Sequence, residues 1–388
     1  MTQLRKVGIV GIGITKFGKH LEKGSRELFY EAAFKAIEDA SIDPKDIEAL
    51  YFGNAVGSVL EHQAHMGPLM AEGLGLRYIP AIRFENACAS SGVALRDAYF
   101  AIASGFYDTV LVGGAEKMVT EKGTLEVTDA LALGADNLFE YNAGLTFPGL
   151  YATIARAHMK KYGTTEEQLA MVSVKNHKNA MDNPNAHFHK EITIEDALNA
   201  RPIAEPLKLF DCCPISDGAA AVIMVSEKYF NKFETPIEII GSGQGSDSIS
   251  LQGRKDITRI VSAEIAARTA YKMAGVTPED IDLAEVHDCF TIAEIIATEG
   301  LGFFKIGEGG KGVEEGETQK DGRIPINVSG GLKAKGHPVG ATGVAQVVEL
   351  VEQLRGEAGK RQVSGAEIGL AHNVGGSGAT ATVHILRR

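Results

Sequence analysis

The chain repeats one pattern of segments, and this repetition restricts the possible folds more than any other feature of the sequence. Residues 32–48 read as a helix, a turn and the start of a strand, and residues 266–282 follow the same plan. Pro44 and Pro278 align with a shift of 234 positions (278 − 44). The sequence therefore predicts two halves with the same succession of elements.

The residues at the turns and strands of the two halves indicate which elements these are. Asp43 and Thr277 are predicted N-caps, each followed by a proline at the first helical position. Glycine-punctuated apolar runs, at 7–13 and 237–243, predict the first strand of each half. Because apolar strands alternate with helices, we expect mostly parallel sheets covered on both faces, in a duplicated α/β protein.

The regular pattern stops in the middle of the first half. We place the N-terminal half at 1–230 and the C-terminal half at 235–388, with an irregular, helix-bearing insertion at about 119–207 in the first. An insertion of this length is usually a lid or a binding loop. It contains His187 and His189, which are either metal ligands or surface histidines. Since the sequence offers no third ligand near them, we favour surface histidines.

The composition argues against several classes of function. The 388 residues carry a formal net charge of −11, which disfavours a nucleic acid as the main partner. No apolar run approaches the ~18 residues that indicate a membrane span, so no membrane association is expected. The four cysteines show neither a disulfide framework nor zinc-ligand spacing, and the strand at Val7 leaves no room for a signal peptide. We therefore expect a cytoplasmic protein.

Cys88 is the first candidate for chemistry. A strand-like run ends at Phe84, and a helical pattern is under way by Val93. A thiol at such a turn would feel free N–H groups and the positive end of the helix dipole, which lower its pKa and suit a nucleophile. For this segment taken alone, a buried structural cysteine is the alternative.

The second half supplies three further segments at places where strands are predicted to end. Residues 285–291, 330–343 and 372–379 carry two imidazoles, a second thiol and several glycines with free backbone N–H groups. In parallel α/β sheets, ligands bind at the carboxyl ends of the strands. We therefore expect these segments to converge with Cys88.

With these segments the chain resembles the thiolases, and within them the sterol-carrier-protein-2-like and archaeal-type branch. The resemblance spans essentially the whole chain. Its specific motifs are Asn-Ala-Cys-Ala-Ser at 86–90, Gly-His-Pro-Val-Gly-Ala-Thr-Gly at 336–343 and His-Asp-Cys-Phe at 287–290. The run at 217–222 also resembles the strand that closes the family's first half.

The resemblance implies a fold and a class of substrate. The fold is two βαβαβαββ halves packed as a five-layer α-β-α-β-α sandwich, with the insertion as a loop domain. The substrates are coenzyme A esters, with no permanently bound cofactor and no metal.

The resemblance also implies a role for each matching residue. Cys88 would attack the acyl-CoA thioester and carry the acyl group, and His337 would take the thiol proton as general base. Cys289 would act as acid and base at the α-carbon of a second acetyl-CoA. Oxyanion holes would be formed by the imidazole N–H groups of His287 and His337, and by the backbone N–H groups of Cys88 and Gly375.

The best-known thiolases carry their second catalytic cysteine in the final turn, where this chain has His372 and Asn373. The thiol stands instead at Cys289, as in the branch named above. This difference makes Cys289 the least direct of the assignments.

Four further residues lie close to these motifs. Cys212 and Cys213 are interpreted as core or packing residues. Lys333 and Lys335 lie near the catalytic loop, where they either meet the phosphates of CoA or are solvated.

The resemblance favours an acetyl-CoA C-acetyltransferase, which interconverts two acetyl-CoA with acetoacetyl-CoA and CoA and would supply the mevalonate pathway. The alternatives are a degradative 3-ketoacyl-CoA thiolase, a thiolase-like retro-aldolase of acyl-CoA esters, and a non-catalytic scaffold subunit. Retention of Cys88, Cys289 and His337 argues against the last two. Implied partners are further copies of the chain, as a homodimer or a dimer of dimers, and a hydroxymethylglutaryl-CoA synthase joined through a zinc-ribbon/OB-fold bridging protein.

Overall fold

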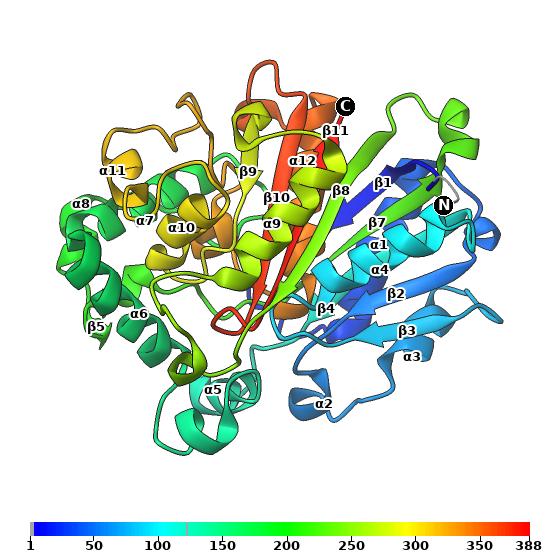
Figure 1. Cartoon of the computed structure of the whole chain (residues 1–388). Helices are drawn as coiled ribbons and strands as arrows, with labels where there is room; N and C mark the ends of the chain where they lie inside the picture. The colour runs from blue at the N-terminus through cyan, green and yellow to red at the C-terminus, as the bar shows by residue number, and fades with distance from the viewer. Residues whose placement is uncertain (1–3, 122) are drawn as a thin grey trace.

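The computed structural model describes residues 4–121 and 123–388, whose main feature is a nine-stranded mixed sheet (Figure 1). The strands lie in the order β3-β2-β4-β7-β1-β8-β11-β10-β9. The first half contributes β1 (Val7–Ile14), β2 (Ala49–Gly53), β3 (Ala81–Phe84), β4 (Thr109–Glu116) and β7 (Gly218–Ser226). The second half contributes β8 (Ile237–Ser246), β9 (Leu283–Glu285), β10 (Ile368–Gly375) and β11 (Thr380–Arg387).

The strand order shows the duplication directly. β1, β2, β4 and β7 of the first half correspond to β8, β9, β10 and β11 of the second, in mirrored order across the sheet. The halves meet where β1 pairs antiparallel with β8, Gly8 opposite Glu238 and Ile9 opposite Ile237. The prediction of two equivalent halves is confirmed.

The directions of the strands correct one expectation. β2 is parallel to β3 and β4, and β9 is parallel to β10, but β7 and β11 run antiparallel to both of their neighbours. The prediction of mostly parallel sheets is therefore wrong. β11 follows β10 through a short turn rather than a crossover helix, and a strand that returns in this way must be antiparallel.

The helices complete five layers. The ones that matter for the site are α1 (Ser25–Ala40), α4 (Ser90–Ala103), α9 (Val261–Ala274), α10 (Thr291–Gly300) and α12 (Thr342–Arg355). α4 and α12 touch each other and strands of both halves, and their apolar side chains share one core cluster between the two parts of the sheet. α1 covers the outer face of the first half and α9 that of the second, each with a cluster of its own. The predicted α-β-α-β-α sandwich is confirmed.

The predicted caps are also found, on very short helices. Asp43 accepts a hydrogen bond from the backbone N–H of Lys45 at the start of the 3₁₀ turn η1 (Pro44–Asp46). Thr277 and Asp280 cap η6 (Pro278–Asp280) at the equivalent place. Because each turn leads straight into the next strand, these caps fix where β2 and β9 begin.

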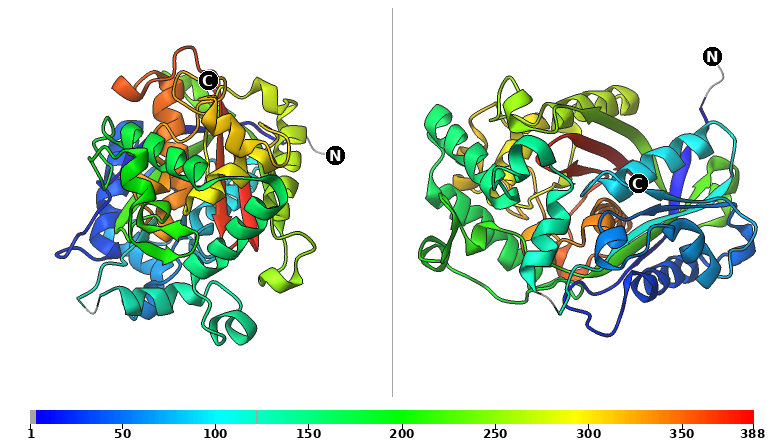
Figure 2. Two further views of the ribbon diagram at one scale, coloured as in Figure 1. Left: turned by 90° about the vertical axis from the view of Figure 1, so that its left-hand side faces the viewer. Right: turned by 90° about the horizontal axis from the view of Figure 1, so that it is seen from below.

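Between β4 and β7 the chain leaves the sheet. The remaining elements of the first half include α2 (Gly57–Leu60) and α3 (Met66–Gly73), and those between β4 and β7 are α5 (Thr124–Ala132), η2 (Asn137–Tyr141), α6 (Phe147–Tyr162), α7 (Glu166–Ala180), α8 (Ile194–Leu198), β5 (Pro202–Ala204), β6 (Leu207–Lys208) and η3 (Leu209–Asp211). α6 and α7 pack on α10, and α7 also contacts α11 (Gly309–Glu314) of the second half. In the left view of Figure 2 these green helices face the viewer together with the gold segment of the second half. The insertion therefore packs on the part of the second half that contains α10 and α11.

None of the helices formed by the described residues combines the length and the apolar character needed to cross a membrane.

Candidate active site

Three of the predicted residues lie where elements of the two halves meet. Cys88 lies in the turn between β3 and α4, and Cys289 between β9 and α10. His337 follows the π-helical turn η7 (Gly331–Lys335) and precedes α12. These three residues and Gly376, just after β10, line one cavity of about 360 Å³. The predicted convergence of Cys88 with the second-half segments is therefore found.

The nucleophile candidate sits beside two imidazoles. One side-chain atom of each of Cys88, His287 and His337 lies within 4.8 Å of the others. The two rings are 5.1 Å apart between centroids and nearly perpendicular, at 83°. A thiolate and two imidazoles are donors that a soft metal ion accepts, and the same three groups suit proton transfer to and from a thiol.

The hydrogen bonds of His337 fix its tautomer. The hydroxyl of Thr342 donates its single proton to the carbonyl of Pro338 at 2.9 Å, so it can only accept from Nδ1 of His337, 2.7 Å away. Nδ1 therefore carries the proton, and Nε2 has a free lone pair. Within the described part of the chain, Nε2 is buried without a hydrogen-bond partner, as a base awaiting a proton would be.

The hydrogen bonds of His287 fix the opposite tautomer. The amide nitrogen of Asn373 donates to the carbonyl of Cys88 at 3.0 Å and to Nδ1 of His287 at 3.1 Å. Since Nδ1 accepts, the proton of His287 lies on Nε2, another buried atom without a partner among the described residues. One imidazole thus presents an acceptor to the site and the other a donor.

The charge state of Cys88 differs from the expectation. Burial raises the pKa of the Cys88 thiol to about 12, although N–H groups of Gly376 and of Cys88 itself act in the opposite direction. The predicted lowering is wrong, because the loss of water around the sulfur outweighs the nearby N–H groups. Burial also lowers the pKa of His337 to about 3. The resting site therefore pairs a neutral thiol with a neutral imidazole.

Besides its own N–H, the N–H that acts on the sulfur of Cys88 is that of Gly376. Gly375, the predicted oxyanion donor, is the preceding residue and ends β10. The predicted roles of Gly375 and of the Cys88 N–H toward an oxyanion stay predictions.

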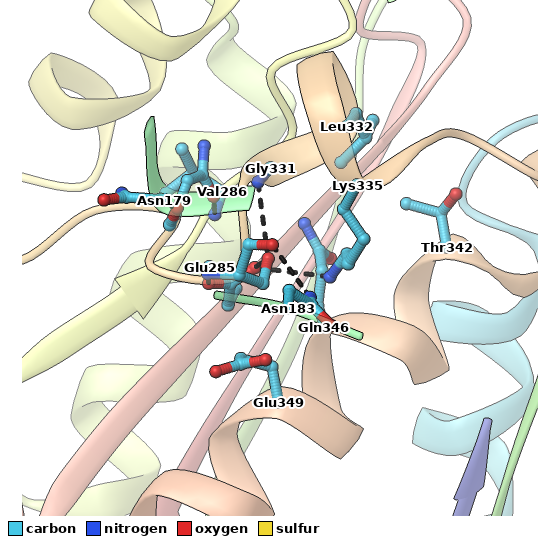
Figure 3. A network of polar contacts seen from close by, with 12 residues as sticks. Asn179, Asn183, Glu285, Val286, Gly331, Leu332, Lys335, Thr342, Gln346 and Glu349 are labelled. Carbon is cyan, nitrogen blue, oxygen red and sulfur yellow. Dashed lines mark hydrogen bonds and ion pairs between the residues drawn. The ribbon is translucent and has the colours of Figure 1, made fainter. Parts of the chain in front are cut away.

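Lys333 and Lys335 are neither solvated nor placed to meet CoA phosphates. Both are about 2% exposed or less. Nζ of Lys333 donates to the carbonyl of Cys212 at 2.6 Å, and Nζ of Lys335 lies 3.5 Å from the carboxylate of Glu285 (Figure 3). Both alternatives fail because the insertion covers this turn, with the N–H of His187 bonded to the Lys335 carbonyl.

The other cysteines and histidines singled out in the sequence are resolved as follows. Cys212 and Cys213 pack against a hydrophobic core cluster, as interpreted, and they also line the same cavity as Cys88. His187 bonds to the hydroxyl of Ser216 at 2.8 Å, and His189 to the carbonyl of Asn183 at 2.8 Å. The two histidines thus serve local structure, in agreement with the surface interpretation.

Two residues of the site carry no signal in the sequence that pointed to them. Asn373 was noted only as the place of a missing cysteine, yet it sets the tautomer of His287. Tyr151, from α6 of the insertion, lines the cavity opposite Cys88. Neither belongs to a motif with a recognisable spacing, so the local sequence could not have identified them.

Comparisons with known proteins agree with this geometry. The model of the thiolase N-terminal domain matches residues 7–228, and that of the thiolase C-terminal domain matches residues 243–388. An acetyl-CoA acetyltransferase of Methanothermobacter thermautotrophicus is 51% identical over 99% of this chain and 100% of that protein. Sterol carrier protein 2 of Bos taurus is 39% identical over 96% of this chain and 71% of that protein. The solved Ltp2–ChsH2(DUF35) aldolase matches with a TM-score of 0.84 at 29% identity, over 98% of this chain and 97% of that one.

Proposed function

The chain belongs to the thiolase family of acyltransferases, and from that premise we propose that it is an acetyl-CoA C-acetyltransferase, which converts two acetyl-CoA to acetoacetyl-CoA and CoA. One observation carries the proposal. A thiol on Cys88, a base nitrogen on His337 and a second thiol on Cys289 line a single cavity, and the imidazole of His287 has an atom within 4.8 Å of Cys88 and His337. The relative from M. thermautotrophicus, which is named for this activity, matches along its whole length.

In the first half-reaction Cys88 takes the acetyl group. Its sulfur bonds to the thioester carbon while its proton moves to Nε2 of His337, and backbone N–H groups of the Cys88 and Gly375 turns hold the oxyanion. The bond from carbon to the sulfur of CoA then breaks, and the leaving thiolate takes the proton of Cys289. Because the thiol and the imidazole are both neutral at rest, proton transfer accompanies the attack rather than preceding it.

In the second half-reaction a new carbon–carbon bond forms. The Cys289 thiolate removes an α-proton from a second acetyl-CoA, and Nε2–H of His287 donates to the developing enolate oxygen. The enolate carbon attacks the acetyl group on Cys88. Acetoacetyl-CoA leaves as the carbon–sulfur bond breaks, and the Cys88 sulfur recovers its proton from His337.

The test is thiolysis of acetoacetyl-CoA by CoA. The purified protein should consume the enolate absorbance of acetoacetyl-CoA, and intact mass should show an acetyl group that maps to Cys88. An adduct without turnover would instead favour a longer 3-ketoacyl-CoA substrate. The absence of both adduct and turnover would refute the proposal.

A retro-aldolase acting on acyl-CoA esters is the second candidate, because the Ltp2–ChsH2(DUF35) relative is an aldolase of closely similar structure. An aldolase needs no acyl-cysteine, whereas this chain keeps Cys88, His337 and Cys289 around one cavity. Cleavage of a β-hydroxyacyl-CoA to an aldehyde or ketone, with no mass added at Cys88, would favour this reading over the thiolase.

The proposal extends to partners and location. We expect an oligomer of this chain, a homodimer or a dimer of dimers in the cytoplasm. The sheet ends at β3, and the exposed side chains of Ile82 in this strand and of Tyr78 just before it support such a contact. The aldolase relative is associated with a DUF35 protein. By analogy, a zinc-ribbon/OB-fold protein would bridge this chain to a hydroxymethylglutaryl-CoA synthase, so that acetoacetyl-CoA supplies the mevalonate pathway. Co-purification of the three proteins tests this.

A further inference from the structure

Tyr151 of α6 is buried beside the second thiol, and no step derived above uses it. It is 1% exposed. Its ring stacks on Phe290, with 4.5 Å between centroids and 25° between planes, and Phe290 directly follows Cys289. Tyr151, Cys289 and Phe290 all line the cavity that contains Cys88. A side chain of the insertion is thus fixed against the loop that carries the second thiol.

The hydroxyl of Tyr151 has two partners of opposite kinds. It donates to the carbonyl of Gly376 at 3.1 Å, and it lies close enough to the Cys289 thiol for a hydrogen bond between the two groups to shift the pKa of both. A hydroxyl has one proton. While Tyr151 donates that proton to the Gly376 carbonyl, its oxygen can only accept a hydrogen bond from the S–H of Cys289. The N–H of the same glycine faces the sulfur of Cys88. The Tyr151 hydroxyl therefore lies between the Cys289 thiol and the glycine whose N–H acts on Cys88.

We infer that Tyr151 is a positioning residue for the second proton transfer. Its hydroxyl holds the Cys289 S–H in place and rotates from the Gly376 carbonyl to the sulfur whenever Cys289 is a thiolate. No covalent bond changes: the hydroxyl keeps its proton and exchanges one acceptor for another. The inference rests on the proposed function, since it concerns the step in which Cys289 removes the α-proton.

The surroundings of Cys289 explain why such a donor is needed. Burial raises the pKa of Cys289 well above its usual value, and the acidic groups of Cys213, Cys88 and Asp288 act in the same direction. The hydrogen bond from Tyr151 acts in the opposite direction. A donor that can follow the charge onto the sulfur lowers the cost of forming the thiolate.

The other charged groups near Tyr151 and Cys289 do not take over the role of the tyrosine hydroxyl. The guanidinium of Arg254, whose charge lowers the pKa of Tyr151, is bonded to the carbonyl and the hydroxyl of Ser377. The ammonium of Lys333, on the side of Cys213, donates to the carbonyl of Cys212. The imidazoles of His287 and His337 are held neutral because burial lowers the pKa of both.

Tyr151→Phe is the test, since it keeps the ring on Phe290 and removes only the hydroxyl. We expect acetylation of Cys88 by acetyl-CoA to slow as well, because the leaving CoA thiolate takes its proton from Cys289 and leaves that thiol as a thiolate. The kcat for condensation should fall roughly ten- to a hundredfold, and the pH of half-maximal kcat should rise by about one to two units, because a hydrogen bond to a charged group is lost. The matched control is Tyr271→Phe, which removes a partly buried hydroxyl bonded to the carbonyl of Leu301 at 2.9 Å, outside the cavity. It should change neither quantity.

A second variant checks the same interaction without removing it. Replacing Tyr151 by 3-fluorotyrosine gives a more acidic and stronger donor, and it should move the pH of half-maximal kcat downward. If both Tyr151 variants keep the wild-type pH profile, or if Tyr151→Phe keeps the wild-type rates of acetylation and condensation, the inference is overturned. If the wild-type protein itself forms no acetyl-Cys88, the proposed function fails, and the inference fails with it.

Discussion

Thr342 decides which nitrogen of His337 is free to act as a base, and Thr342→Val tests this directly. The hydroxyl of Thr342 donates to the carbonyl of Pro338 and accepts from Nδ1–H of His337 at 2.7 Å. Valine has nearly the same shape but no oxygen. In the variant the imidazole must either leave a buried Nδ1–H unpaired or move its proton to Nε2, the nitrogen that should receive the proton of Cys88.

The size of the effect follows from the environment of the ring. His337 is 5% exposed, so water does not replace the lost partner. A buried donor left without an acceptor costs about 1–3 kcal/mol. If that cost appears in the barrier for attack by Cys88, acetylation slows roughly five- to 150-fold, since each 1.36 kcal/mol is a factor of ten.

The assay is the single-turnover acetylation of Cys88 by acetyl-CoA, followed by rapid quenching and intact mass. Thr298→Val is the matched control, because the hydroxyl of this buried threonine in α10 also donates to a backbone carbonyl, that of Ile295 at 2.8 Å, with no imidazole beside it. Both variants should lose similar stability, and only Thr342→Val should lose rate. Equal acetylation rates in Thr342→Val and the wild type would refute the assignment of the tautomer.

Four further outcomes are expected. Cys88→Ala should abolish both the acetyl adduct and the thiolysis of acetoacetyl-CoA, with an unchanged circular dichroism spectrum; residual thiolysis would exclude Cys88 as acyl carrier. Cys289→Ala should still form the adduct but stall at condensation, and absence of the adduct by mass would give Cys289 another role. Glu116→Gln should lower the free energy of unfolding in urea by about 1–3 kcal/mol, because an amide would face the backbone N–H groups of Ala55, Val56 and Gly340 that now donate to the carboxylate; an unchanged unfolding midpoint would contradict this. Burial lowers the pKa of His384 to about 4 from 6.5, so the unfolded chain binds more protons than the folded one between these pH values. The stability that is present above pH 6.5 is therefore lost as the pH falls toward 4. His384→Gln should make this pH dependence of the free energy of unfolding shallower, and an equal slope in urea titrations would exclude His384 as its source.

The fold and the main site residues could be predicted because both follow from local patterns. The shift between Pro44 and Pro278 indicated two equivalent halves, and the strand order confirms them. Cys88, Cys289 and His337 each lie in a turn after a strand or before a helix, and such turns gather at one edge of the sheet. A rule about strand ends was therefore sufficient to bring together residues up to 249 positions apart (337 − 88).

The pKa values and solvent exposures that depend on burial under distant segments of the chain could not be predicted. The dipole argument for Cys88 considered only its own helix, whereas the pKa is decided by burial under parts of the chain far away in sequence. Lys333 and Lys335 were expected to meet either the CoA phosphates or solvent, and both alternatives fail because the insertion covers the turn that carries them. Tyr151 reaches the site from that insertion. The sequence predicts helices there, but it does not indicate which loops of the second half these helices pack against.

The contact between the two central helices explains why a duplicated chain has one site rather than two. α4 and α12 are equivalent elements, and each begins just after a catalytic turn, the first after Cys88 and the second after His337. They cross at Gly92 and Gly343, where a Cβ on Gly343 would lie 2.5 Å from the backbone nitrogen of Gly92. Only glycine allows this approach, and the approach places the nucleophile of one half beside the base of the other. Neither half by itself therefore holds the nucleophile Cys88 together with its base His337, and the chemistry depends on how closely the two repeats pack.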